Sequence, residues 1–282
     1  MDEVVRAVAL GLLVMLAGTI PRNIAFAANL QLAPGVPWAV PVMALYLWFF
    51  WRYLDGAGPP RPTATARAES LRANRVTARV WAWSLAAGGF GIVTLVIALR
   101  LLNRVVHLSP QQLPDLSHVP RTTVFALLLA AAPIAGIVEE AAFRGYMQGP
   151  IERRHGLPIA VLITGTMFAI AHLDFTPILW PYYLAVAAIY GAVTARADSI
   201  LPAVVLHTAG NLYSNLDLLL HGQAEWQASA ATTSIWQTGV DAPFVRSLVA
   251  LLIVATATLA AYAKLGRTTP RRPAPPRLSR DG

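Results

Sequence analysis

Apolar runs long enough to cross a lipid bilayer recur along this chain, and they constrain its fold more than any other feature. Thr122–Val138 holds no charged residue, and Val80–Leu102 holds one. A membrane-spanning helix needs about 20 mainly apolar residues. The whole sequence is 56% hydrophobic and 13% charged, with a mean hydropathy of +0.54, which is too apolar for an ordinary soluble domain. The runs are continuous rather than alternating, so we predict an all-α polytopic membrane helical bundle and not a β-barrel.

The runs predict about eight transmembrane helices. A signal peptide begins with basic residues, but this chain has the acidic Asp2 and Glu3 there. We therefore expect the first run to be an uncleaved helix, although Ala25–Ala27 resembles an A-x-A cleavage site. Gly149 and Pro150 are expected to end the fourth helix. The expected spans are Val4–Ile20, Trp38–Tyr53, Val80–Leu102, Thr122 to about Gly149, Leu157–His172, Ile178–Arg196, Ile200–Leu220 and Pro243–Lys264.

The net charge of +8 is concentrated in a few connecting segments. Arginines crowd residues 55–79, Arg153 and Arg154 follow the fourth run, and the C-terminal tail is also basic. Basic clusters at alternate helix ends follow the positive-inside rule, so we expect topology rather than nucleic-acid binding to explain the charge. Both termini are then cytoplasmic, and the scarcity of lysine favours a bacterial inner (cytoplasmic) membrane. The sequence leaves the oligomeric state open.

These patterns divide the chain into four parts. We expect N-terminal helices in 1–120, with a basic, flexible or partly amphipathic loop at 55–79, and a functional core in 121–220. A polar segment and the last helix occupy 221–264, and a basic disordered tail occupies 265–282.

Two carboxylates and an arginine end the fourth run, in the sequence Glu139-Glu140-x-x-x-Arg144. An ionised residue near the bilayer centre costs on the order of 2.5–3.5 kcal/mol, so such groups usually face a protein interior or a cavity. Arg144 lies four residues after Glu140, the spacing of an ion pair within a helix. This leaves Glu139 as the freer carboxylate and a candidate general base, although a structural Glu–Arg pair is an equal alternative.

Later apolar runs carry Phe168-x-x-x-His172 and His207-x-x-x-Asn211. His207 and Asn211 share a helix face, where they could stabilise an oxyanion or simply join helices by hydrogen bonds. His172 falls about 22 Å along its helix, so that helix must tilt or shift for His172 to meet Glu139 and His207. The chain has no cysteine, which excludes thiolate nucleophiles and thiolate metal sites.

The three motifs together resemble the signature of the CAAX protease and bacteriocin-processing (CPBP, or Abi) intramembrane proteases. The resemblance covers about Thr122–Leu220. It implies that Glu139 activates the attacking water together with His172. It further implies that His207 and Asn211 support the oxyanion, while Glu140, Arg144 and Phe168 shape the site.

The resemblance implies a membrane endopeptidase that acts on a membrane-associated protein or peptide near its C-terminal segment. Glu139, His172 and His207 could instead form a metalloprotease-type set of two histidines and one carboxylate for a divalent metal such as zinc. Without an H-E-x-x-H motif, the sequence leaves the metal open. The alternative is a non-catalytic transporter, immunity or scaffold protein, in which the same residues bind an ion or pack helices.

Overall fold

A computed structural model of the chain describes residues 3–106, 115–172, 179–221 and 233–268, apart from the side chain of His221. Within these ranges the structure is helical and contains no strand. Four described helical segments are long and apolar enough to cross a membrane: Glu3–Leu32, Ala78–Val105, Arg121–His155 and Ala242–Thr268. Ala39–Leu54 and Leu157–Ala171 are shorter apolar helices. The predicted helical membrane bundle is confirmed, whereas the count of eight spans remains a prediction.

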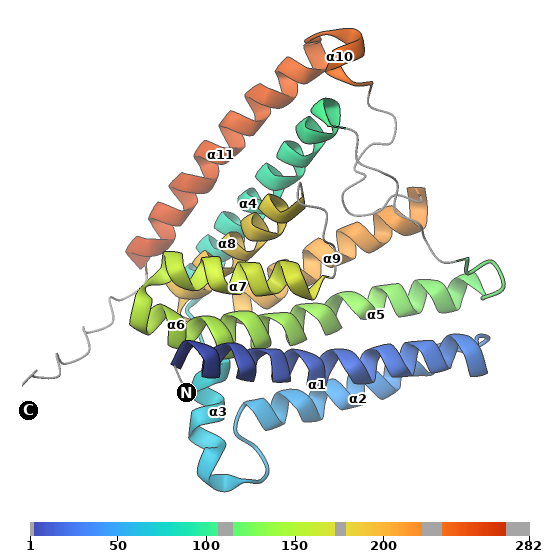
Figure 1. Cartoon of the computed structure of the whole chain (residues 1–282), viewed down its shortest axis with the longest axis vertical. Coiled ribbons are helices and arrows are strands. Elements are labelled where there is room, and N and C mark those ends of the chain that lie inside the picture. The colour runs from blue at the N-terminus through green and yellow to red at the C-terminus, as the bar shows by residue number, and fades with distance from the viewer. Residues whose placement is uncertain (1–2, 107–114, 173–178, 222–232, 269–282) are drawn as a thin grey trace, which may run out of the picture.

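Two groups of helices make up the bundle (Figure 1). Helices α1 (Glu3–Leu32), α2 (Ala39–Leu54) and α5 (Arg121–Glu139) lie side by side, with α9 (Leu201–His221) against α5. Helix α4 (Ala78–Val105) pairs with α11 (Ala242–Thr268), at an angle to the first group in Figure 1. Helices α7 (Leu157–Ala171) and α8 (Trp180–Ala197) form a hairpin, and α8 contacts both α4 and α9.

The fourth apolar run does not end at Gly149 and Pro150. Helix α5 continues as a π-helical segment, η2 (Glu140–Met147), and then as α6 (Gln148–His155). Pro150 falls in the first turn of α6, where a missing backbone N–H is tolerated. Gly156, with a φ of 82°, ends α6, so Glu152–His155 is helical and not the loop that the sequence predicted.

The basic loop contains a short helix, α3 (Ala64–Leu71), preceded by a 3-10 turn, η1 (Arg61–Thr63). The buried side chain of Arg67 donates to the carbonyl oxygens of Tyr53 at 2.8 Å and of Gly58 at 3.0 Å. Beyond α3, Arg72 pairs with Glu152 at 3.0 Å and Asp198 at 3.2 Å. This part of the expected flexible loop is therefore tied to the bundle.

Two further differences concern the helices, and some expectations fall on residues that the structure does not describe. Helix α1 continues through Pro21 to Leu32, so Ala25–Ala27 lies inside it. The short helix α10 (Ile235–Thr238) lies within the expected polar segment. The basic tail from residue 269, residues 222–232 of the polar segment, residues 107–114 and the start of the sixth span at Ile178 lie outside the described residues.

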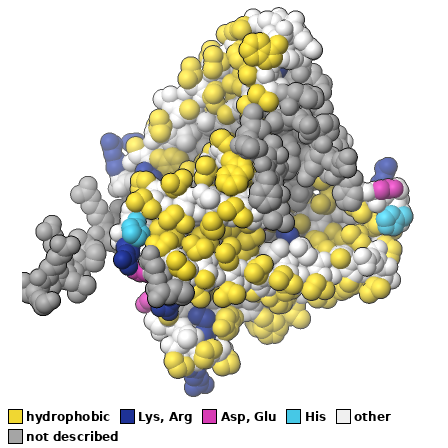
Figure 2. Space-filling model, viewed as in Figure 1, with side chains coloured by type: hydrophobic (Ala, Val, Ile, Leu, Met, Phe, Trp, Pro, Cys, Tyr) yellow, Lys and Arg dark blue, Asp and Glu magenta, His cyan; other side chains and the backbone are white. Residues whose placement is uncertain are grey.

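Apolar side chains cover much of the outer surface (Figure 2). Leu13 on α1 and Ile253 on α11 are 61% and 64% exposed. Because helices satisfy their own backbone hydrogen bonds, such surfaces are suited to contact with lipid acyl chains. Together with the long apolar helices, they identify an integral membrane protein.

Candidate active site

The two adjacent carboxylates lie where α5 passes into η2. Glu140 and Arg144 are both fully buried, and Glu140 Oε1 lies 3.1 Å from Arg144 Nη1. The ion pair expected from their spacing is therefore present. It forms within a π-helical turn, a distortion that the sequence pattern did not reveal and that often occurs at functional sites.

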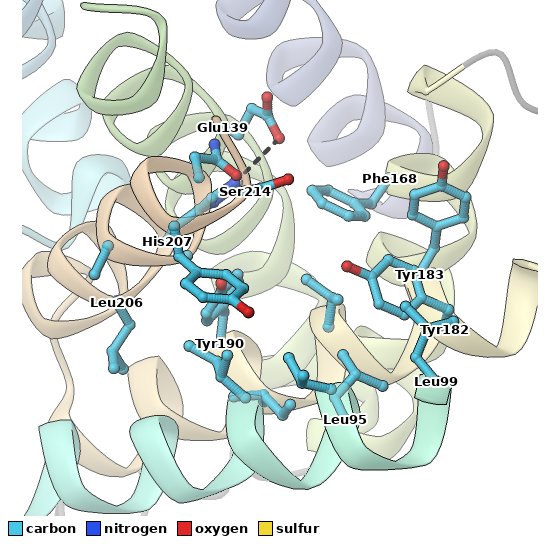
Figure 3. Close-up of a pocket in the computed structure, with 18 of the residues that line it drawn as sticks. Leu95, Leu99, Glu139, Phe168, Tyr182, Tyr183, Tyr190, Leu206, His207 and Ser214 are labelled. Atoms are coloured by element: carbon cyan, nitrogen blue, oxygen red, sulfur yellow. Dashed lines mark ion pairs between the residues drawn. The ribbon is translucent and has the colours of Figure 1, made fainter. Parts of the chain in front are cut away.

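His207 joins the two carboxylates from α9. Its Nδ1 donates to Glu140 Oε1 at 2.8 Å, and its Nε2 faces Glu139 Oε2 at 3.8 Å (Figure 3). Glu140 thus binds both Arg144 and His207, and it fixes the direction of the imidazole. Glu139 has the looser contact, which matches its expected place as the freer carboxylate.

Small residues let the helices that carry these groups approach closely. A Cβ atom added to Gly136 of α5 would overlap the side chain of Thr208 on α9. A Cβ atom added to Gly18 of α1 would likewise overlap Val138. Glu139 therefore follows directly after two tight helix crossings, and the Gly136–Thr208 contact sets the register that brings His207 to both carboxylates.

Aromatic rings enclose the Arg144 guanidinium. Its central carbon lies 5.0 Å from the ring centroid of Phe168, 5.4 Å from that of Tyr190 and 5.9 Å from that of Phe143. Aromatic faces attract a desolvated cation, so the rings offset part of the free energy needed to bury Arg144. Arg144 lies behind Glu140 and is not among the residues that line the adjacent cavity.

His172 and His207 both lie near the Phe168 ring, at centroid distances of 4.5 Å and 6.2 Å. Its Nδ1 lies 2.8 Å from the carbonyl oxygen of Phe168, and its ring packs on Phe168 at 4.5 Å and on Tyr183 at 4.6 Å. Within the described part of the chain, His172 makes no hydrogen bond or ion pair with Glu139. The two side chains instead line the same cavity.

The cavity has a volume of about 290 Å³ and lies between α4, α8 and α9, with Glu139 and the end of α7 at its wall (Figure 3). The α4 wall is apolar and includes Ile92, Leu95 and Leu99. The lining also includes the polar side chains Glu139, His172, His207, Asn211, Ser214 and Asp217. The site thus combines a general-base candidate, two imidazoles and an amide beside an apolar wall.

Asn215 has a different position. Its side chain donates to the carbonyl oxygen of Leu128 on α5 at 2.7 Å. It is absent from the cavity lining, so it joins α9 to α5, whereas Asp217 lines the cavity.

The proposed metal ligands are not gathered into one set. Among the residues that the structure describes, no group of three or more histidine, aspartate or glutamate side chains is arranged to hold a metal ion. Glu139 and His207 are neighbours, whereas His172 makes no hydrogen bond or ion pair with either of them in the described residues. The arrangement therefore does not fit a zinc site built from these three residues, and we derive no catalytic step through a metal.

Two aromatic residues on α8 complete the site and were missed by the sequence analysis. Tyr183 packs on His172, and Tyr190 stacks on His207 with a centroid distance of 5.0 Å and an interplanar angle of 18°. Both lie in an apolar helix, and the sequence alone does not distinguish a tyrosine that only packs there from one that belongs to a functional site. Their spacing of seven residues places them on one helix face, which was the available clue.

Comparison with known families agrees with the motif pattern. Residues 121–213 match the family model described as "Type II CAAX prenyl endopeptidase Rce1-like". The match begins with α5, ends within α9 and contains all seven candidate site residues. This stretch is similar to the Rce1-like domain of the CPBP family, the family that the sequence motifs resemble. No curated protein and no solved structure matches the chain.

Proposed function

We propose that this protein is an intramembrane endopeptidase that hydrolyses a peptide bond near a membrane-associated C-terminal segment of its substrate. The observation that carries the proposal is the position of Glu139, which contacts His207 and opens on a partly apolar cavity. A water-activating base and an apolar binding wall are the two requirements of hydrolysis at a lipid-bound peptide. The Rce1-like match supports the same class of reaction.

In the proposed reaction, Glu139 accepts a proton from a water molecule while the water oxygen attacks the scissile carbonyl carbon. The carbonyl oxygen becomes an oxyanion, which His207 and Asn211 stabilise from the α9 face. His172 shares in orienting the water from the other side of the cavity. The C–N bond then breaks, and the proton held by Glu139 passes to the departing amine.

Glu140 and Arg144 act behind this reaction. Glu140 holds the Nδ1 proton of His207, so the Nε2 side of the imidazole is directed to the cavity and to Glu139. Arg144 compensates the buried charge of Glu140. Neither residue needs to touch the substrate.

The basic segments support a proposal for the orientation. The start of α1, helices α3 and α6 and the end of α11 lie at one end of the bundle (Figure 1). By the positive-inside rule we assign this end, and with it both termini, to the cytoplasmic side of a bacterial inner membrane. The Rce1-like domain then forms the core at 121–220, with the preceding helices and α11 around it.

The test uses full-length protein in lipid nanodiscs and an internally quenched peptide with an isoprenylated cysteine near its C-terminus. The same peptide without the lipid group reports whether the apolar wall contributes. We expect Glu139→Gln to abolish cleavage and Glu3→Gln to leave it intact, because Glu3 is half-exposed in a pair with Arg154. Cleavage of this peptide by Glu139→Gln at the wild-type rate would refute the mechanism.

A further inference from the structure

Tyr190 of α8 contacts two of the buried groups that define the site. Its ring lies nearly parallel to the imidazole of His207, with 5.0 Å between centroids and 18° between planes (Figure 3). The same ring lies 5.4 Å from the guanidinium carbon of Arg144. Only 5% of Tyr190 is exposed. One aromatic side chain therefore bridges the α9 histidine and the η2 arginine.

The position of Tyr190 is itself fixed from several sides. The next residue, Gly191, packs closely on Gln148, and the Gln148 side-chain amide donates to the Gly191 carbonyl oxygen at 3.0 Å. The ring packs with Val193, Ala203 and Leu206. A Cβ atom added to Gly210 of α9 would lie 3.3 Å from the tyrosine hydroxyl, so the far end of the ring rests against the α9 backbone.

An imidazole can turn by about half a revolution around its χ2 bond, because χ2 of histidine is broad and roughly two-fold. Such a turn would exchange each ring nitrogen of His207 with a carbon. Nδ1 would leave Glu140, and Nε2 would leave Glu139. The hydrogen bond to Glu140 favours the present orientation over the turned one. Stacking on a fixed tyrosine ring raises the barrier between the two, because the imidazole must leave the stacked plane midway through the turn.

We propose that Tyr190 is a positioning residue, which keeps the plane of the His207 ring fixed while the hydrogen bond to Glu140 directs Nε2 to Glu139 and the cavity. It does so by stacking, so an aromatic ring is required at position 190. This inference deepens the proposed function and rests on it for the activity readout. Its structural readout is independent of any substrate.

The first experiment observes the six histidines of the chain in full-length protein labelled with ¹⁵N-histidine. Long-range ¹H–¹⁵N spectra report which ring nitrogens carry a proton, and His207→Gln identifies the His207 signals. We expect wild type and Tyr190→Phe to show one fixed state of His207, an imidazolium whose Nδ1 proton lies toward Glu140 and whose Nε2 proton lies toward Glu139 and the cavity. We expect Tyr190→Leu and the volume-filling Tyr190→Met to show signals averaged between states.

Tyr262→Leu is the matched control. Tyr262 packs on the same apolar cluster from α11, and its hydroxyl donates to the Ile189 carbonyl oxygen at 2.9 Å. Its removal disturbs the same packing without removing the ring stacked on His207. A His207 pattern that changes equally in Tyr262→Leu would attribute the effect to general loosening of the bundle and overturn the proposal.

The second experiment measures cleavage of the quenched lipopeptide. Small misplacements of catalytic groups reduce rates by up to about 100-fold, so we expect Tyr190→Met to lower kcat by roughly 10- to 100-fold with a smaller change in KM. Tyr190→Phe should retain wild-type kcat. An unchanged His207 signal pattern in both Leu and Met variants would overturn the inference. A changed His207 pattern together with full activity of Glu139→Gln would instead refute the proposed function while retaining the role of Tyr190.

Discussion

Glu140 Oε1 lies 2.8 Å from Nδ1 of His207, although 67 residues separate them in the sequence. The same oxygen lies 3.1 Å from Arg144 Nη1. One buried carboxylate oxygen therefore connects η2 to α9 and also balances the arginine. The neighbouring Glu139 does not share this role, because it is partly exposed to the cavity and has its only ion pair in the described structure with His207 at 3.8 Å.

Because Glu140 is paired and buried while Glu139 faces the cavity, we predict that replacing Glu140 lowers the stability of the protein much more than replacing Glu139. Glu140→Gln leaves the fully buried Arg144 without its counter-charge, and breaking a buried pair in this way costs about 3–5 kcal/mol. Glu139→Gln should change the free energy of unfolding by less than about 1 kcal/mol, since its ion pair with His207 is long, at 3.8 Å, and Glu140 still binds that imidazole at 2.8 Å. Denaturant unfolding in a defined detergent measures both values, and lipopeptide cleavage should be lost in both variants. Equal stability of the two variants would contradict this prediction.

The ion pair between Glu140 and Arg144 predicts that the stability losses of replacing each residue do not add in the double variant. Arg144→Met alone leaves Glu140 as an uncompensated buried carboxylate, whereas Arg144→Met with Glu140→Gln removes both charges. Replacing a buried pair by neutral groups is often close to neutral, so we expect the double variant to be more stable than either single variant. A double-mutant cycle measures this coupling. Additive losses would show that the aromatic rings, rather than Glu140, hold Arg144.

The local contacts of the site could be predicted from the sequence. Arg144 follows Glu140 by four residues, and His172 follows Phe168 by four, and in both pairs the second side chain contacts the first residue. Such contacts depend on helix spacing alone. The apolar runs also predicted most helices, because the length needed to cross a bilayer is set by its thickness.

Contacts between helices could not be predicted from the sequence. His207 could pair with Glu139, Glu140 or neither, depending on the register of α9 against α5. The Gly136–Thr208 contact sets that register, but a glycine in a long apolar run gives no indication of its partner. The position of His172 relative to Glu139 depends likewise on how α7 packs. The π-helical turn was also hidden, because no residue type in Glu140–Met147 specifies it.

The Gly136–Thr208 contact predicts that a larger side chain at position 136 of α5 moves His207 away from Glu139 and Glu140. Gly136→Val places a branched side chain where Thr208 lies, so α9 must shift away from α5 and carry His207 with it. Overpacking of this kind destabilises by about 1–3 kcal/mol, and we expect a larger loss in cleavage than in stability. Gly89→Ala is the stability control, because a Cβ atom at Gly89 meets no atom within 4 Å. Wild-type cleavage by Gly136→Val would show that the close crossing is not needed.

The ion pair between Arg104 and Asp241 predicts a pH-dependent attachment of α11 to α4. Asp241 Oδ2 lies 2.8 Å from Arg104 Nη2. The hydrogen bond from Arg104, followed by one from the Phe244 backbone N–H, lowers the pKa of Asp241 below its ordinary value. A carboxylate with a lowered pKa in the folded state stabilises that state at pH values above its unfolded pKa of about 3.9. This stabilisation is lost as the pH falls through the lowered, folded-state pKa.

We therefore expect Asp241→Asn to be less stable than wild type at pH 7 and equal to it in strong acid. Hydrogen exchange of the first turn of α11, read by mass spectrometry between pH 3 and 7, measures the local effect after correction for the intrinsic exchange rate. Asp115→Asn is the matched control, because the pKa of Asp115 is also lowered, by hydrogen bonds from Ser117, without any contact to α11. A wild-type advantage that persisted unchanged at the lowest pH would show that the Asp241 charge does not hold this end of α11.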